Sequence, residues 1–232
     1  MVDLTVEMAS LWSALGPAPL DRGRVVQFVS ASTGEGTSTV AREFARLAAG
    51  RARRPVWLVD ADLDDQSQMA AVNAEPERFG RLGRAAGASP DGSIFFGFRP
   101  PVRDREGRPI GDANLLAARP AMDARLWITR LRLDMIGGQR AEIAPSGAYW
   151  DALRRYADHV VIDAPAADRS DTAMQLAPYA DLTVLVLAAD ETEAGAVADL
   201  RDRIDAAGGR VAGLVLNRTR VKTPKFLKRL VS

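Results

Sequence analysis

The sequence contains no cysteine, and its 232 residues include a single histidine, His159. Disulfide bonds and thiolate metal sites are therefore excluded, and one histidine cannot build a zinc cluster by itself. Lysine is almost as scarce, because 31 residues are basic but lysine occurs only at Lys222, Lys225 and Lys228. A chain without cysteine fits a reducing compartment, so we expect a cytoplasmic location.

Long apolar runs are also missing. No window approaches the ~18 apolar residues that a transmembrane helix needs. Asp3 and Glu7 lie where a signal peptide would carry positive charge. The formal net charge is +1 and the basic residues are spread along the chain, which gives no basis for nucleic-acid binding. The sequence predicts a protein that neither spans a membrane nor is exported, and that does not bind nucleic acid.

What the chain does contain is an alternation of strand-like and helix-like segments. An apolar content of 47% over this length suits one large α/β domain. The predicted strands are 25–29, 55–60, 126–136, 159–163, 182–188 and 211–217. Predicted helices run from the end of the first strand's loop to Gly50, over 146–157, and around Val197, Leu200 and Ile204. We expect a mostly parallel central sheet with helices on both faces.

The most informative segment is Ala31-Ser-Thr-Gly-Glu-Gly-Thr-Ser38, between the first strand and the first helix of this alternation. It nearly matches the phosphate-binding loop G-x-x-x-x-G-K-[ST], but Thr37 stands where the lysine belongs. Backbone N–H groups of such a loop cradle phosphate. The candidate nucleotide-binding residues here are Gly34, Glu35, Gly36, Thr37, Ser38 and Thr39. The alternative is a tight strand-to-helix turn that binds no ligand.

Acidic residues end two of the predicted strands. Asp60 and Asp62 close Trp57-Leu-Val-Asp-Ala-Asp, and Asp163 follows Val160-Val-Ile. Ligands bind at the carboxyl edge of parallel sheets, where such carboxylates can hold Mg²⁺ or orient a water. Asp60, Asp62 and Asp163 are therefore the catalytic candidates, and Ser38, Asp60 and Asp163 the Mg²⁺ ligands if a nucleotide binds. Helix capping or a solvated turn is the alternative.

These motifs, in this order, resemble the cytoplasmic ATPase domain of the bacterial tyrosine autokinases that accompany polysaccharide co-polymerases in capsule and exopolysaccharide export. Residues 29–40 are similar to the first Walker motif of that family, 57–63 to its second and 160–165 to its Walker B motif. Residues 180–187 and 213–218 resemble its last two strands. The resemblance implies a P-loop NTPase-like fold, ATP and Mg²⁺ as cofactors, and a role for Asn217 in binding the adenine.

Three departures from the family pattern point to lost catalysis. Thr37 replaces the lysine, and removing one donor to the transition state typically lowers a rate by ~10²- to 10³-fold. The family ends in a tyrosine cluster, whereas Tyr149, Tyr156 and Tyr179 all lie well before the end of this chain. The family's first helix carries Glu-x-x-Arg-x-x-Arg for ring assembly, whereas Glu7 is followed by serine at both arginine positions. Ring assembly is therefore not predicted, and the oligomeric state is left open.

The sequence thus predicts a catalytically degenerate P-loop protein. We expect it to act as a regulatory or scaffold partner of a separate membrane co-polymerase with a periplasmic chain-length domain, in export of a surface polysaccharide such as a capsule or a holdfast-type adhesin. ATP and Mg²⁺ should bind weakly or not at all. The expected location is cytoplasmic, at the inner face of the cell membrane through that partner.

Two alternatives are kept. One is an active ATPase or protein-tyrosine kinase in which an arginine, for instance Arg42, takes the lysine's role. A weaker one is a positioning ATPase of the partitioning type, which would need lysine at the position of Ser32.

The chain divides into an N-terminal helical segment over 1–20, one P-loop-like domain over 21–218 and a basic tail over 219–232. Residues from about 76 to 125 are expected to form a long irregular excursion, with room for a short hairpin inside it, because glycine and proline are frequent there. Its aromatic run Ile94–Phe98 either docks a partner or is buried, and burial is favoured. Basic residues from Arg218 onward surround Phe226 and two leucines. This pattern fits either contact with anionic lipid or an acidic partner or, as we favour, a solvated helix.

Overall fold

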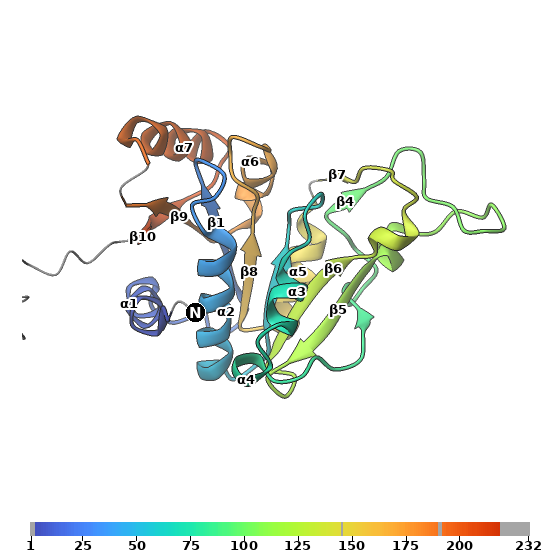
Figure 1. The fold of residues 1–232 in the computed structure, drawn as a ribbon, viewed down its shortest axis with the longest axis horizontal. Helices are drawn as coiled ribbons and strands as arrows, with labels where there is room; N and C mark the ends of the chain where they lie inside the picture. The colour runs from blue at the N-terminus through green and yellow to red at the C-terminus, as the bar shows by residue number, and fades with distance from the viewer. Residues whose placement is uncertain (1–2, 145, 190–191, 219–232) are drawn as a thin grey trace, which may run out of the picture.

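A computed structural model describes residues 3–144, 146–189 and 192–218 (Figure 1). The predicted basic tail, 219–232, lies outside these residues. The described strands are β1 (Arg24–Ser30), β2 (Val56–Asp60), β3 (Ala86–Gly87), β4 (Phe96–Gly97), β5 (Leu116–Ala121), β6 (Leu126–Leu131), β7 (Glu142–Ile143), β8 (His159–Asp163), β9 (Leu182–Ala188) and β10 (Val211–Asn217). The described α-helices are α1 (Thr5–Leu15), α2 (Thr37–Arg51), α3 (Gln68–Asn73), α4 (Pro76–Phe79), α5 (Gly147–Tyr156), α6 (Thr172–Leu176) and α7 (Ala194–Ala206).

The central sheet has eight strands in the order β10-β9-β1-β8-β2-β6-β5-β3. The first five neighbouring pairs, from β10 to β6, are parallel, and the last two are antiparallel. Parallel strands need crossover connections, and helices supply most of them here. The mostly parallel α/β architecture predicted from the sequence is therefore confirmed.

Successive side chains of the central strands face two different helical layers, because side chains alternate along a strand. Val26 and Phe28 of β1 belong to the core beneath α1, α2 and α3. Val25 and Val29 face the opposite layer, formed by α5, α6 and α7. Burial on both faces explains why these strands are almost continuous apolar runs. None of the described helices combines the length and apolar character that crossing a bilayer requires.

Helix α1 lies beside α2 (Figure 1) and is anchored by two side chains. Met8 is buried, and the ring centroid of Trp12 lies 4.8 Å from that of His159, the first residue of β8. The hydroxyls of Ser10 and Ser13 donate to carbonyls one turn earlier in α1, at 3.0 Å each. These serines, which stand where the family pattern has arginine, are thus engaged within their own helix.

The irregular excursion predicted over about 76–125 ends earlier than expected, because 116–121 forms the regular strand β5. This strand pairs antiparallel with β6 through a tight turn in which Met122, Asp123 and Ala124 all have positive φ. The run Leu116-Ala-Ala-Arg-Pro-Ala has no β-branched residue and contains Pro120, so its strand character is not visible in the sequence. Pro120 is tolerated because β3 pairs only with residues 117 and 118 of β5. At Pro120, β5 is therefore the edge strand of the sheet, where a missing N–H is acceptable.

The predicted strand 126–136 is also too long at its end. β6 stops at Leu131, and a short 3₁₀ turn, Leu133–Met135, follows. The backbone N–H of Leu131 donates to the side chain of Gln66 at 2.7 Å, and that of Met135 donates to the Arg132 carbonyl at 2.9 Å. The chain therefore leaves the sheet at its carboxyl edge, where the following loop begins.

The aromatic run Ile94–Phe98 is buried, as favoured from the sequence. Phe95, Phe96 and Phe98 are at most 4% exposed. The ring centroid of Phe95 lies 5.1 Å from that of Tyr149 and 5.2 Å from that of Trp150, both on α5. The run therefore attaches the long connection between β2 and β6 to the core, and its phenylalanines present no surface to a partner.

Candidate nucleotide site

The loop between β1 and α2 has the backbone of a phosphate-binding turn. Gly34 and Gly36 have φ of 90° and 91°, a region that side chains with a Cβ rarely adopt. Gly36 also has no room for a side chain, because a Cβ there would lie 2.1 Å from Nδ2 of Asn217. That amide donates to the Glu35 carbonyl at 2.9 Å. The glycines predicted from the motif are thus required by both backbone angle and space.

Five consecutive backbone N–H groups of this loop, those of residues 34–38, have no acceptor among the residues that the structure describes. The next two, of Thr39 and Val40, donate to the Gly36 carbonyl at 3.1 Å each. The unpaired groups lead into the N-terminus of a 15-residue helix, where the helix dipole adds positive potential. This arrangement is suited to binding an anion.

A pocket of about 340 Å³ opens beside the loop. The sequence-predicted residues that line it are Gly34, Gly36, Thr37, Ser38, Thr39, Asp62 and Asp163. The lining does not include Asp60, Glu35 or Asn217. It does include two arginines, Arg169 and Arg218.

Thr37 is the first residue of α2, at the position where the motif has lysine. Its side chain is 7% exposed, and its buried hydroxyl has no hydrogen-bond partner in the described structure. Residues 31–38 contain neither lysine nor arginine. The loop therefore offers a phosphate its backbone N–H groups, its hydroxyls and no positive side chain.

Asp60 and Asp163 face each other because β2 and β8 pair in parallel with these residues in register. They are 1% and 2% exposed. Gln68, at the start of α3, connects them: its backbone N–H donates to Asp60 at 3.0 Å, and its side-chain amide donates to Asp163 at 2.6 Å and to the Ser38 carbonyl at 2.8 Å. Sheet register and one glutamine thus place both carboxylates behind the loop.

Burial raises the pKa of Asp60 well above its usual range, and the neighbouring charge of Asp163 raises it further. Burial also raises the pKa of Asp163, while hydrogen bonds from Gln68 and Ser38 and the charge of Arg42 act in the opposite direction. Two buried carboxylates of like charge favour either a bound proton or a nearby cation.

The residues present fit a Mg²⁺-nucleotide. Asp163 Oδ1 is buried and has no hydrogen-bond partner in the described structure, and Ser38 lines the same pocket. Carboxylate and hydroxyl oxygens are the ligands that Mg²⁺ takes, together with phosphate oxygens. Ser38 and Asp163 would hold the ion, with Asp60 behind them, and the ion would neutralise phosphate charge.

The geometry limits two sequence-based assignments. The Glu35 side chain is 4% exposed and lies outside the pocket lining, and it accepts from the Ser32 N–H at 3.0 Å and from the Thr192 hydroxyl, so only the Glu35 backbone N–H is available for the predicted nucleotide-binding role. Arg42 does not line the pocket either, because its guanidinium donates to the Gln68 side chain at 3.2 Å. The Glu35 side chain thus stabilises the loop by accepting from Ser32. Arg42 stabilises the acidic pair indirectly, through Gln68.

Several residues of the site were not predicted from the sequence, among them Gln68, Asp168, Arg169 and Arg218. Gln68 belongs to no motif, and Asp168 and Arg169 lie in the segment after β8. Asp168 accepts from the backbone N–H and the hydroxyl of Thr33, at 2.9 Å each. The only signal for Asp168 and Arg169 is that they follow a strand end at the carboxyl edge, where ligands bind in such sheets.

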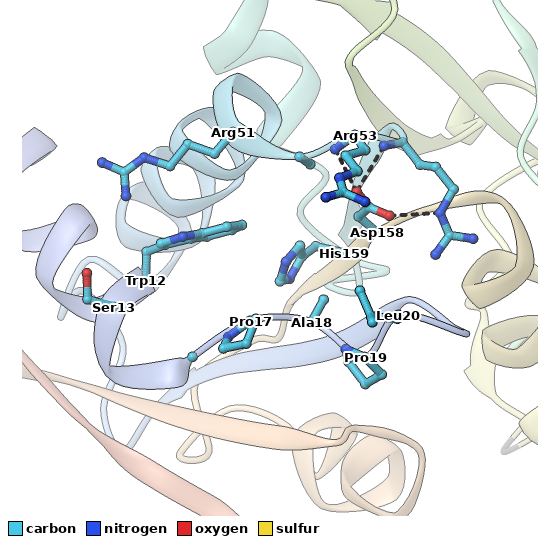
Figure 2. Close-up of a pocket in the computed structure, with 13 residues that line it drawn as sticks. Trp12, Ser13, Pro17, Ala18, Pro19, Leu20, Arg51, Arg53, Asp158 and His159 are labelled. Carbon is cyan, nitrogen blue, oxygen red and sulfur yellow. Dashed lines mark hydrogen bonds and ion pairs between the residues drawn. The ribbon is translucent and has the colours of Figure 1, made fainter.

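A second pocket, of about 560 Å³, lies at the opposite edge of the sheet, beside the first residue of β8. Figure 2 shows Trp12 and His159 in its wall, with Pro17, Ala18 and Pro19 along one side. Its one carboxylate, Asp158, already accepts from the backbone N–H groups of residues 53 and 54 and from the Arg54 side chain. This pocket is the junction of α1 with the domain and lacks the glycine loop of a phosphate site.

Replacing Gly36 with alanine is expected to lower the free energy of unfolding by more than the ~1–2 kcal/mol of backbone strain. The added methyl group would displace Asn217 from the Glu35 carbonyl. Gly34→Ala is the matched control, because φ is the same within a degree and nothing lies within 4 Å of its Cβ position. Urea unfolding measures both variants, and equal losses would contradict a steric role for Asn217.

No protein-family model matches the sequence, and no curated protein sequence gives a significant match. Solved structures do match. The kinase domain of VpsO has a TM-score of 0.51 at 22% identity, over 85% of this chain and 86% of that one. The kinase domain of the Escherichia coli tyrosine kinase Etk has a TM-score of 0.56 at 14% identity, over 88% and 70%. MinD from Pyrococcus horikoshii, complexed with Mg-ADP, has a TM-score of 0.51 at 18% identity, over 90% and 77%.

At such identities the likeness shows the fold. The chain has the P-loop NTPase-like α/β fold that bacterial tyrosine kinase domains share with MinD. The resemblance to tyrosine autokinase domains predicted from the sequence is confirmed at this level.

Proposed function

We propose that this protein is a catalytically degenerate P-loop protein that regulates or scaffolds a membrane polysaccharide co-polymerase from the cytoplasmic face. In this role it binds a nucleoside polyphosphate with Mg²⁺, weakly, and transfers phosphate inefficiently or not at all. The alternative within the same pathway is an active ATPase or tyrosine kinase.

The single observation that carries the proposal is Thr37 in the lysine's place. Phosphoryl transfer depends on positive charge placed against the β- and γ-phosphates before the reaction. Here the loop contributes only neutral donors, and the change of lysine to Thr37 removes that charge. The glycines, the free backbone N–H groups and the acidic pair support retention of a binding frame.

The kinase alternative is weakened by two placements. Arg42, the arginine we considered as a substitute, is hydrogen-bonded to Gln68 and outside the pocket lining. Tyr149 is fully buried and so inaccessible as a phosphate acceptor, although Tyr156 is 58% exposed. A positioning ATPase is weakened by Ser32, which offers no lysine.

The pathway and the partner rest on the fold shared with tyrosine kinase domains and on the motif order in the sequence. The proposed partner is a co-polymerase with membrane helices and a periplasmic chain-length domain. A capsule or a holdfast-type adhesin is the class of product proposed, and location at the inner face of the membrane follows from the partner.

The catalytic part is tested by phosphate release from Mg-ATP and by phosphotyrosine on the purified chain. We expect release at least ~10²-fold slower than from a lysine-containing P-loop protein measured alongside. The Asp60→Asn variant should release phosphate at the same low rate as the unmodified chain, because we expect that residual release not to depend on this site. Fast release or phosphotyrosine that Asp60→Asn abolishes would establish the kinase or ATPase alternative.

The partner part is tested by co-expression with the co-polymerase encoded nearest to its gene. We expect the two to co-purify from detergent-solubilised membranes and the chain to remain soluble when expressed alone. Deleting either gene should reduce the same surface polysaccharide. Loss of the polysaccharide with the co-polymerase gene but not with this one would overturn the proposed role.

A further inference from the structure

Arg169 forms an ion pair with Asp62 in the wall of the phosphate pocket. The two residues come from different loops, Asp62 from the one after β2 and Arg169 from the one after β8. Their side chains are 15% and 43% exposed. The guanidinium is therefore beside the pocket and partly open to solvent.

The backbone on both sides of this pair is fixed. Asp62 accepts from the N–H of Asp65 at 3.0 Å through one oxygen, which leaves the other for Arg169. On the other side, Asp168 accepts from Thr33, and the backbone N–H of Ala167 donates to the Ser30 carbonyl at 2.9 Å. Arg169 is thus attached next to the loop, and only its side chain needs to turn to reach an anion there.

The pocket carries independent signs of a ligand. The hydroxyl of Thr37 and Oδ1 of Asp163 are buried without partners in the described structure, and both residues line this pocket. Buried polar atoms normally have hydrogen-bond partners. Together with the five unpaired N–H groups of the loop, they leave a set of donors for phosphate and an acceptor for a cation.

We infer that Arg169 supplies positive charge for the diphosphate portion of a nucleotide bound in this pocket, where the loop itself offers none. Asp62 holds the guanidinium when no anion is present, and the guanidinium moves from Asp62 to phosphate oxygens when one binds. Arginine suits this exchange because its planar group binds carboxylate and phosphate in the same bidentate way. The inference rests on the nucleotide site of the proposed function and identifies Arg169 as the positively charged side chain of that site.

Calorimetry with two probes, inorganic pyrophosphate and ADP, tests this in EDTA so that no divalent ion contributes. We expect Arg169→Ala to weaken both by at least ~10-fold, since a hydrogen bond to a charged group is lost. Arg169→Lys should lose less. Arg140→Ala is the matched control: Arg140 pairs with Asp64 of the same acidic loop at 2.6 Å but does not line the pocket, so its loss should leave the affinity unchanged.

The exchange with Asp62 is tested by Asp62→Asn, which should tighten pyrophosphate binding several-fold by releasing Arg169. Asp65→Asn measures the general effect of removing a carboxylate, because Asp65 lines the same pocket without pairing with Arg169. The gain in pyrophosphate affinity should be larger in Asp62→Asn than in Asp65→Asn. Equal gains in the two variants would show that Asp62 does not hold Arg169 away from the anion. Thermal unfolding of each variant separates lost binding from lost folding.

Unchanged affinity in Arg169→Ala, or no binding of either probe by the unmodified chain, would overturn the inference. Neither result bears on the co-polymerase partnership. Conversely, the unmodified chain could turn over ATP rapidly while Arg169→Ala weakens binding of the probes. That result would overturn the proposal that the protein is catalytically degenerate and would support the role of Arg169.

Discussion

Restoring the lysine with Thr37→Lys is expected to increase affinity for Mg-ATP by at least ~10-fold, because an ammonium group would then hydrogen-bond to phosphate at the start of α2. The frame for this gain exists: Gly34 and Gly36 have the required backbone angles, and the N–H groups of residues 34–38 are unpaired among the described residues. Calorimetry or a fluorescent nucleotide analogue measures the change.

Thr37→Met is the control, because it adds length at the same position without charge. Equal affinities of the lysine and methionine variants would mean that the loop cannot seat a polyphosphate, and would count against the binding half of the proposed function. The loss caused by Arg169→Ala should also be smaller in the Thr37→Lys background, because two cations then share one anion. An undiminished loss would indicate separate roles.

Acidification is expected to destabilise the fold through the single histidine. The pKa of His159 is lowered from 6.5 to about 4, first by burial and then by the charge of Arg24, against the opposing charge of Asp158. Between these values the unfolded chain is protonated and the folded one is not. Stability contributed by the neutral ring is complete above pH 6.5 and decreases as the pH falls to 4, by up to about 3 kcal/mol.

Because the chain has one histidine, NMR of the imidazole gives its pKa without assignment. A value near 6.5 in the folded protein would contradict the expectation. His159→Phe keeps an aromatic ring against Trp12, which lies 4.8 Å away by centroid, and removes the titration. The difference in unfolding free energy between wild type and this variant, followed from pH 7 to 4, isolates the histidine from carboxyl groups that titrate in the same range.

The parts of the fold predicted from the sequence are those whose signal is local. β8, β9 and β10 have the predicted bounds, because each is a short apolar run ended by a polar or small residue. The glycine loop and the strand-end aspartates were also visible, since a parallel sheet brings such ends to one edge. Sheet order could not be read, but once β2 lies beside β8 the register alone places Asp60 opposite Asp163.

What the sequence did not predict depends on contacts between distant segments. Gln68 joins Asp163 across 95 residues, and no propensity or spacing marks a glutamine for that role. Arg169 is ordinary in a chain rich in arginine until the fold places it opposite Asp62. β5 is a strand because β6 provides its partner, in spite of alanines and Pro120 that disfavour one locally.

The unpartnered hydroxyl of Thr37 has a consequence for which substitutions the loop can accept. No hydrogen bond of the described fold depends on that hydroxyl, so the packing of this buried position restricts the size of the residue there but no polar contact requires threonine. Gly36 and Asn217, by contrast, are in steric contact, and neither can change freely without the other. The glycines are therefore fixed by the geometry of the loop, whereas the side chain at position 37 is not held by any hydrogen bond of the described fold.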